Sequence, residues 1–320
     1  MSRSVLVTGA SPDYGNRNSV LRSYVAEGFR EELGEDAVSH VPLEVAAAAV
    51  RERRPDLVLC FGSCMPDDAD YLELRRLCDQ YGGALAFWLH DDPYEFDYNY
   101  RINGIADLVF SNDRWSSLHY ANPNTRHLAL AASRKAHWRP LGTPKDIDVF
   151  FCGVAFGNRI RLVRDLKAVL ARFDTRIRGD QWPESELPFA KNERLPNDEL
   201  SRNYARSLVT LNMGRDFHYA NERYKLDPST PGPRTFEAAM AGTTQMFFVE
   251  SLEILDYYVP GKEIVLYDSV AQFKEKLEWL MQDHAACLSI ARASQARTEA
   301  DHTYTNRART VLGALAEISA

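Results

Sequence analysis

The chain has 320 residues, of which 45% are hydrophobic and 26% charged, a composition typical of a globular protein with room for two domains. Its net charge of −7 and its pI near 5.7 argue against a general nucleic-acid-binding protein. The longest apolar runs, such as ADLVF and TTQMFFV, are far shorter than the roughly 20 residues of a membrane span. The first residues run straight into an apolar strand pattern without a signal peptide, so we expect a cytoplasmic protein.

The cysteines do not form the pattern of a disulfide framework or of a metal site. Their number is odd, and most stand in apolar stretches, which indicates reduced core thiols. Cys60 and Cys64 have no second pair at metal-ligand spacing, so we predict no structural zinc. The remaining cysteines are Cys78, Cys152 and Cys287.

In the first half of the chain, short apolar runs alternate with amphipathic segments. The alternation predicts a parallel sheet covered by helices on both faces, and hence a Rossmann-like domain over residues 1–143. The expected strands are 4–9, 38–43, 56–62, 84–91, 106–112 and 126–132, and the expected helices are near 18–33, 44–53 and 67–81.

Such a sheet binds ligands at the carboxyl ends of its strands. The loops after Gly9, Gly62, Leu89 and Ser111 are therefore expected to line one crevice, on which the polar loop 11–19 would close.

The motif VTGAS at 7–11 invites comparison with short-chain dehydrogenases. The closely spaced glycines of that class are absent, however. The one Tyr-x-x-x-Lys, from Tyr258 to Lys262, contains Pro260 and Gly261 and cannot place both side chains on one helical face. We therefore disfavour a dehydrogenase.

A dense polar segment, WLHDDPYEFDYNYR, follows the strand expected at 84–91. His90, Asp91 and Asp92 stand where α/β enzymes carry catalytic groups, and one of them is suited to accept a proton from a hydroxyl nucleophile. The alternative is a capping cluster in which Asp92 begins the next helix and His90 is bonded in the interior.

The basic, proline-broken segment 133–146 is interpreted as the interdomain connection. A second Rossmann-like domain is expected over residues 144–300, and a final helix over 301–320. Its expected strands are 146–153, 175–182, 207–213, 243–249 and 263–268, and its expected helices are near 197–206, 251–257, 270–282 and 284–299.

Several residues of this second domain suit an anionic ligand. The turn GVAFGNRIR opens a helix after the first strand, where free N–H groups and arginines favour an anion. A solvated, arginine-rich turn is the alternative. The candidates are Gly153, Asn158, Arg159, Asn212, Arg215 and Lys225.

The segment TPGPRTFEAAMAG, 230–242, carries the strongest signal. Proline and glycine at 231–233 predict that a helix begins near Pro233 or Arg234. Its N-terminus and Arg234 suit a diphosphate, and Glu237, one turn along the same face, can accept hydrogen bonds from a ribose diol. An ordinary capped helix is the alternative.

The order of these motifs resembles the GT-B glycosyltransferases, and most closely the CgeB-like (spore-maturation) family. The matching pieces are WLHDDPYEFD, DVFFCG, SLVTLNM, PGPRTFEAAMAG, YYVPGKEIVLYDS and DHTYTNRAR. The resemblance implies two Rossmann-like domains facing across a cleft, with the last helix crossing back to the first domain. It also implies a nucleotide-sugar donor held by the second domain and a small-molecule or glycan acceptor held by the first.

Carried over residue by residue, the resemblance places the donor ribose on Glu237 and the diphosphate on Arg234 and Thr235, with His90 or Asp91 at the reacting centre. Many related enzymes have a second glutamate eight residues before the first, but this chain has Ser229 there.

We accordingly expect transfer of a sugar from a nucleoside diphosphate to a hydroxyl or amine acceptor, with no cofactor and no metal. The alternatives are a nucleotide-sugar epimerase or hydrolase on the same fold, or a non-catalytic nucleotide-binding module.

Overall fold

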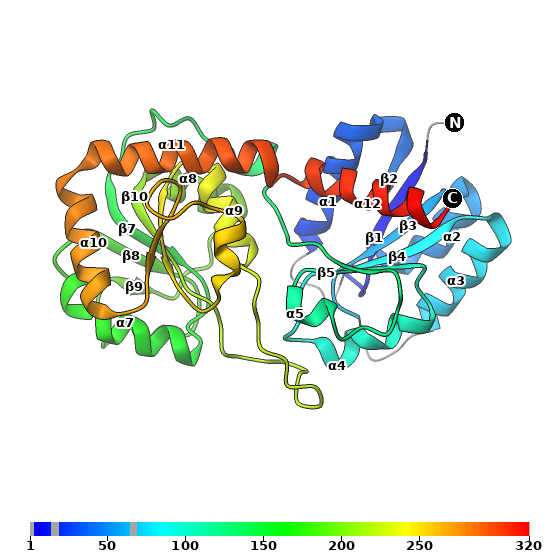
Figure 1. Cartoon of the computed structure of the whole chain (residues 1–320), viewed down its shortest axis with the longest axis horizontal. Coiled ribbons are helices and arrows are strands. Elements are labelled where there is room, and N and C mark those ends of the chain that lie inside the picture. Colours follow the sequence, from blue (N-terminus) through cyan, green and yellow to red (C-terminus); the bar gives the residue numbers. More distant parts are fainter. Residues whose placement is uncertain (1–2, 14–18, 65–68, 320) are drawn as a thin grey trace. The chain divides into compact units, whose positions relative to one another are not determined.

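The structure, a computed structural model, describes residues 3–13, 19–64 and 69–319 of the chain. It divides into two compact units, each with its own parallel sheet (Figure 1). The first unit comprises Met1–Leu130, His218–Thr230 and Thr303–Ala320, and the second comprises Ala131–Phe217 and Pro231–His302.

The first unit is built on a six-stranded parallel sheet with the order β2-β1-β3-β4-β5-β6. Its strands are β1 (Val5–Gly9), β2 (Val38–His40), β3 (Leu57–Phe61), β4 (Ala84–Leu89), β5 (Leu108–Ser111) and β6 (Thr125–His127). Its α-helices are α1 (Ser19–Leu33), α2 (Ala46–Arg53), α3 (Ala69–Tyr81), α4 (Phe96–Asn99), α5 (Arg114–Ser117) and α12 (Tyr304–Ile318), with short 3₁₀ turns at Glu35–Ala37, Leu43–Val45 and Tyr100–Gly104.

The second unit has a six-stranded parallel sheet with the order β12-β11-β10-β7-β8-β9. Its strands are β7 (Ile147–Cys152), β8 (Thr175–Arg178), β9 (Ala190–Lys191), β10 (Ser207–Asn212), β11 (Thr244–Phe248) and β12 (Val265–Tyr267). Its helices are α6 (Arg134–His137), α7 (Gly157–Leu170), α8 (Asn197–Arg206), α9 (Pro233–Met240), α10 (Val270–Gln282) and α11 (His284–Asp301), with a 3₁₀ turn at Leu252–Asp256.

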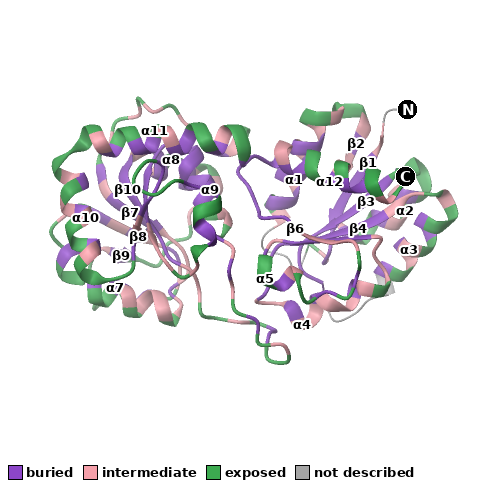
Figure 2. Cartoon of the chain, in the orientation of Figure 1, coloured by how far each residue is buried: buried purple, intermediate pink, exposed green. Residues whose placement is uncertain are grey.

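The prediction of two Rossmann-like domains is confirmed. Apolar runs became strands because both faces of each sheet are covered, and Figure 2 shows the strands buried while the helices expose one face. In the second sheet, strands numbered within the unit lie in the order 3-2-1-4-5-6, the order of the Rossmann fold.

The strand expected at 126–132 is shorter than predicted and ends at His127. The N–H of Leu128 still donates to the carbonyl of Ser111 on β5, but the carbonyls beyond the strand accept from side chains. Trp88 donates its indole N–H to the carbonyl of Leu128, and Arg307 donates to the carbonyls of Ala129 and Leu130. These donors satisfy the buried carbonyls without a strand partner.

The predicted boundary after residue 143 needs correction. Contacts place the boundary between Leu130 and Ala131, so most of the segment 133–146 belongs to the second unit and does not serve as a free linker. Ser133 caps the short helix α6, and His137 at its end is buried. The predicted crevice loop 11–19 lies mostly outside the described residues.

Residues 218–230, which we call the arm, leave the second unit after β10 and pack within the first unit. The carboxylate of Asp97 accepts the backbone N–H groups of Glu222 and Arg223. The carboxylate of Asp113 accepts the N–H groups of Ser229 and Thr230 and the hydroxyl of Ser229. No feature of the sequence predicted this arrangement.

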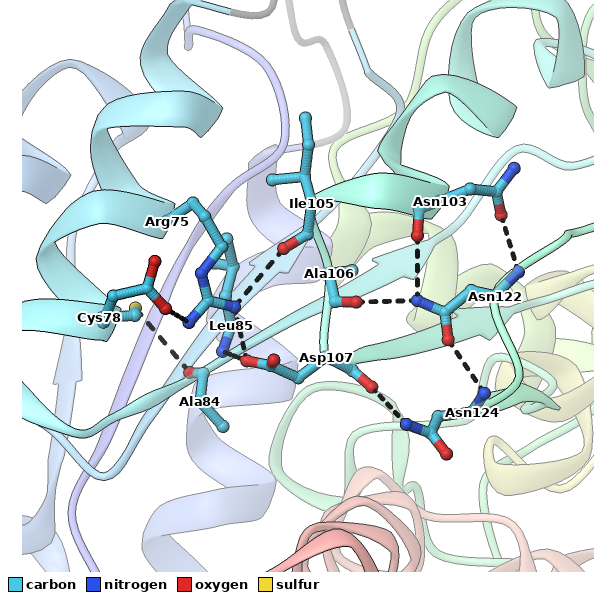
Figure 3. Close-up of polar contacts among 11 residues, drawn as sticks. Arg75, Cys78, Ala84, Leu85, Asn103, Ile105, Ala106, Asp107, Asn122 and Asn124 are labelled. Carbon is cyan, nitrogen blue, oxygen red and sulfur yellow. Dashed lines mark hydrogen bonds and ion pairs between the residues drawn. The ribbon is translucent and has the colours of Figure 1, made fainter.

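The amino ends of β4 and β5 are held by a polar network (Figure 3). The Asp107 carboxylate accepts from Arg75 at 2.6 Å and from the N–H of Leu85 at 2.8 Å, and Asn122 and Asn124 donate to neighbouring backbone carbonyls. A cavity of about 550 Å³ lies beside it, lined by Arg3, Asp56, Arg75, Asp79, Asp107 and Ser319 among others. It lies at the edge opposite to the one where such sheets bind ligands.

Helices α1 and α12 pack closely at Gly28. A Cβ atom at this position would stand 2.5 Å from the backbone carbon and oxygen of Tyr304. Only glycine therefore allows the last helix to approach α1 this closely.

We predict that Gly28→Ala lowers the stability of the first unit by about 1–3 kcal/mol, because the added methyl group forces the two helices apart. The matched control is Gly313→Ala on α12, where a Cβ atom would meet nothing within 4 Å. This control should be neutral or stabilising by up to about 1 kcal/mol, since alanine favours helix. Thermal unfolding of both variants tests the prediction, and equal melting temperatures would contradict it.

Candidate functional site

The second sheet has its topological switch point between β7 and β10. The chain runs outward from this point in both directions, so the loops after the two strands diverge and leave room for a ligand. The strands end at Cys152 and Asn212. Four of the predicted donor-binding residues follow one of these two ends: Gly153, Asn158, Arg159 and Arg215.

Arg159, in the first turn of α7, ties the two loops together. Its guanidinium donates to the carbonyls of Gly214 at 2.7 Å, Val154 at 3.0 Å and Met213 at 3.0 Å. It also lies over the rings of Phe151 and Phe156. These contacts give Arg159 a structural function at the switch point, while its predicted contact with a diphosphate stays a prediction.

The glycine that follows β7 is required by close packing. A Cβ atom on Gly153 would stand 2.9 Å from the guanidinium of Arg159, and one on Gly179 would stand 2.0 Å from the carbonyl oxygen of Gly153. Gly179 also has φ of +143°, which favours glycine. The indole of Trp182 donates to the same carbonyl at 2.9 Å.

Two asparagines brace the same loops. Asn158 donates to the carbonyl of Gly214 at 3.2 Å and accepts the N–H of Asp216 at 3.3 Å. Asn212 donates its amide to Gln245 on the neighbouring strand β11. Asn158 thus orders the backbone at the switch point, and Asn212 links the side chains of two neighbouring strands.

Helix α9 begins where the sequence predicted. Gly232 is the N-cap and Pro233 the first helical residue, because proline needs no N–H partner there. Arg234 follows with 44% of its side chain exposed, and Thr235 is buried. The helix N-terminus therefore offers a partly exposed arginine side chain beside the positive end of the helix dipole.

Glu237 lies one turn further along α9 with only 3% of its side chain exposed. Arg234 donates to its Oε2 atom. Burial raises the pKa of Glu237, but its neighbours, Arg234 first and then His137, outweigh burial and hold that pKa below its usual value. The carboxylate is therefore charged at neutral pH.

This part of α9 lies near the end of β7. Burial raises the pKa of the Cys152 thiol, and the charge of Arg234 partly offsets that rise, which requires the two side chains to be close. Ala238 and Ala241 of α9 share one apolar cluster with Ile147 and Phe150 of β7. The structure thus brings Arg234 and Glu237 to the switch point.

The sequence reasoning missed His137. Its Nε2 atom lies 3.9 Å from Oε1 of Glu237, and 3% of its side chain is exposed. The signal was the N-cap serine of α6 four residues earlier, which marks a short helix within the segment interpreted as a linker.

The other two predicted cations belong to different units. Arg215 follows β10 in the second unit, and its guanidinium lies over the ring of Phe156. Lys225 is exposed on the arm, which belongs to the first unit, and has φ of +53°.

In the first unit, the predicted catalytic residues follow β4. His90 is buried, with its Nδ1 atom 3.4 Å from the Ser63 hydroxyl and its ring against Phe61. Asp91 is half-buried. Both stand at the carboxyl edge of the sheet, where ligands bind in this class of fold.

Asp92 is instead buried and accepts several hydrogen bonds. It is 1% exposed, and its carboxylate accepts hydrogen bonds from Asn99 at 2.8 Å, Ser111 at 2.6 Å and Tyr120 at 2.9 Å. Burial raises its pKa to about 6, although these three donors oppose the rise. Such contacts give Asp92 a structural function, although not the capping one expected as the alternative, because the N-cap of α4 is Glu95.

The described residues contain no metal cluster and no membrane helix. No three His, Cys, Asp or Glu side chains within 3–13, 19–64 and 69–319 gather as metal ligands would. In the same part of the chain, no helix combines the length and apolar character needed to cross a bilayer.

Residues 159–313 match the sequence model of the glycosyl transferase-like family. This range holds Arg159, Arg234 and Glu237 but not His90. A search of curated proteins finds no match.

The solved structures that resemble the chain share its fold at low identity. HepE from Anabaena, in complex with UDP and glucose, aligns with a TM-score of 0.64 at 12% identity over 98% of this chain and 100% of that one. Sucrose-phosphate synthase from Thermosynechococcus elongatus aligns at 0.62 and 10% identity, over 99% of each chain. The fold is the GT-B fold.

The raised pKa of Asp92 predicts a pH-dependent stability. This carboxyl has a pKa of about 6 in the folded chain and about 3.9 when unfolded, so between these values the folded state binds the proton more tightly. Relative to Asp92→Asn, the wild type should lose about 2–3 kcal/mol of stability as pH rises from about 4 to 6. Urea unfolding of both proteins from pH 4 to 7 measures this. A constant difference would contradict it.

Proposed function

We propose that the protein is a glycosyltransferase that moves a sugar from a nucleoside-diphosphate sugar to a hydroxyl or amine acceptor without a metal. The second unit binds the donor, and the first binds the acceptor. We further propose that it is a cytoplasmic, hexose-transferring member of the CgeB-like group, as the order of its sequence motifs suggests.

The observation that carries the proposal is the first turn of α9. A partly exposed arginine, a helix N-terminus and a buried, charged carboxylate lie between Gly232 and Glu237, next to the switch point of a Rossmann sheet. Arg234 and the helix N-terminus suit a diphosphate, and Glu237 suits the two hydroxyls of a ribose. The turn thus offers one set of groups for the diphosphate of a nucleotide and another for its ribose.

The leaving group of the reaction is the nucleoside diphosphate, which gains negative charge as the glycosidic bond breaks. Arg234 and the α9 N-terminus stabilise this charge, assisted by Arg215 or Lys225. These groups supply the positive charge that a metal ion would otherwise bring. In the first unit, His90 or Asp91 accepts the proton of the acceptor nucleophile.

A ligand screen tests the proposal. Thermal stability is measured with UDP, GDP, ADP and CDP and with their sugars, first in EDTA and then with Mg²⁺. Ligand at a hundredfold excess over its dissociation constant should stabilise the fold by about 2.7 kcal/mol, a shift of several degrees. UDP is the first candidate because HepE, a similar fold, is described in complex with it. Donor consumption without any acceptor would indicate an epimerase or hydrolase instead.

We predict that Arg234→Ala lowers turnover about a hundredfold or more, since removal of one preorganised donor costs roughly 3–4 kcal/mol. The matched control is Arg164→Ala on α7, which removes an exposed arginine paired with Glu186 in the same unit. Steady-state kinetics with saturating donor distinguish the two. Near-wild-type turnover of Arg234→Ala in a folded protein would refute its assignment.

We predict that Glu237→Gln weakens nucleotide binding about tenfold to a hundredfold, because a ribose diol would lose its charged acceptor. Glu186→Gln, which removes an exposed carboxylate from the same unit, serves as the control. Isothermal titration with the nucleotide found in the screen gives both affinities. Equal affinity in Glu237→Gln and the wild type would contradict the assignment of Glu237 to the ribose.

A further inference from the structure

The Glu237 carboxylate is held by two side chains of different character. Arg234 donates to Oε2, and the imidazole of His137 faces Oε1 at 3.9 Å. Arg234 is partly exposed, whereas His137 is as deeply buried as the carboxylate itself. One partner of Glu237 is therefore accessible to a ligand and the other is not.

The orientation of the His137 ring is fixed by its own helix. The backbone N–H of Ser133 donates to Nδ1 at 3.0 Å, so this nitrogen carries the lone pair and the ring proton of the neutral imidazole is on Nε2. The Ser201 hydroxyl of α8 donates to the His137 carbonyl at 3.0 Å and anchors the end of α6. The ring nitrogen that carries the proton is thus the one that lies 3.9 Å from Oε1 of Glu237.

This second partner matters when a ligand arrives. A diphosphate at the α9 N-terminus attracts the accessible guanidinium of Arg234, which would draw it from the carboxylate. A buried carboxylate left without any partner is strongly unfavourable. His137 is the partner that the ligand does not compete for.

We propose that His137 is a positioning residue that keeps the Glu237 carboxylate charged and correctly turned toward the ribose hydroxyls while Arg234 binds the diphosphate. The inference rests on the proposed function, which assigns Glu237 to the ribose. The ligand class is a ribonucleoside diphosphate, and His137 itself makes no contact with it.

Two substitutions separate this function from simple packing. In His137→Asn the side-chain oxygen can still accept the Ser133 N–H, but the shorter side chain does not reach Glu237. In His137→Gln the longer amide places an N–H near the position of Nε2. Both variants remain polar and smaller than histidine, and their melting temperatures report whether they fold.

The experiment measures the affinity for UDP and for its 2′-deoxy and 3′-deoxy analogues by isothermal titration. If the wild type prefers GDP, ADP or CDP, that nucleotide and its deoxy analogues are used in place of UDP. The wild type should bind at least one deoxy analogue tenfold or more weakly than the parent nucleotide. His137→Asn should bind the parent about tenfold more weakly and lose most of this preference for the hydroxyl. His137→Gln should restore both to within about threefold.

A folded His137→Asn variant that keeps the full preference for the ribose hydroxyl would overturn the inference, even if its affinity fell. If His137→Asn does not fold, His137→Gln decides: this variant still offers an N–H near the position of Nε2, so a tenfold loss of its hydroxyl preference would also overturn the inference. Failure of the proposed function looks different, because the wild type would then bind no nucleoside diphosphate at all.

Discussion

A charged carboxylate buried one turn into helix α9 is the feature on which the candidate site of the second unit depends. Glu237 is 3% exposed, and burial of a lone carboxylate is far too unfavourable to persist. Two neighbouring side chains stabilise the carboxylate, Arg234 on the same helix and His137 on α6. The short helix α6, its Ser133 cap and its anchor on α8 are therefore part of one arrangement built around a single charge.

Carboxylates also determine the path of the chain before α9. Asp97 and Asp113 bind the backbone of the arm within the first unit, and the Asp113 carboxylate takes the N–H groups of Ser229 and Thr230. Gly232, the N-cap of α9, follows two residues later in the second unit. The start of the candidate phosphate-binding helix is thus covalently joined to a backbone segment that the first unit holds.

The sequence predicted the features that depend on local physics. Apolar periodicity located the strands and the longer helices, and Pro231 to Pro233 located the start of α9, because proline and glycine restrict the backbone wherever they stand. It missed features that depend on distant partners. His137 is buried by α8 and α9, and the arm is bound by carboxylates more than a hundred residues away in the chain. For Asp92 both interpretations fitted the sequence, and only the three donors around it favour the structural one.

The position of Ser229 bears on how a donor sugar would be recognised. Many enzymes that this chain resembles carry a glutamate eight residues before the ribose-binding one, and Ser229 stands there in this chain. Its N–H and hydroxyl both donate to Asp113, and it is 6% exposed. A side chain that is buried and already hydrogen-bonded to Asp113 is not available to bind a sugar. Under the proposed function, recognition of the sugar therefore falls to other residues, and the loops after β7 and β10 at the switch point are the natural place for them. There Arg159, Asn158 and Gly153 already fix the backbone, so its N–H and C=O groups have defined directions.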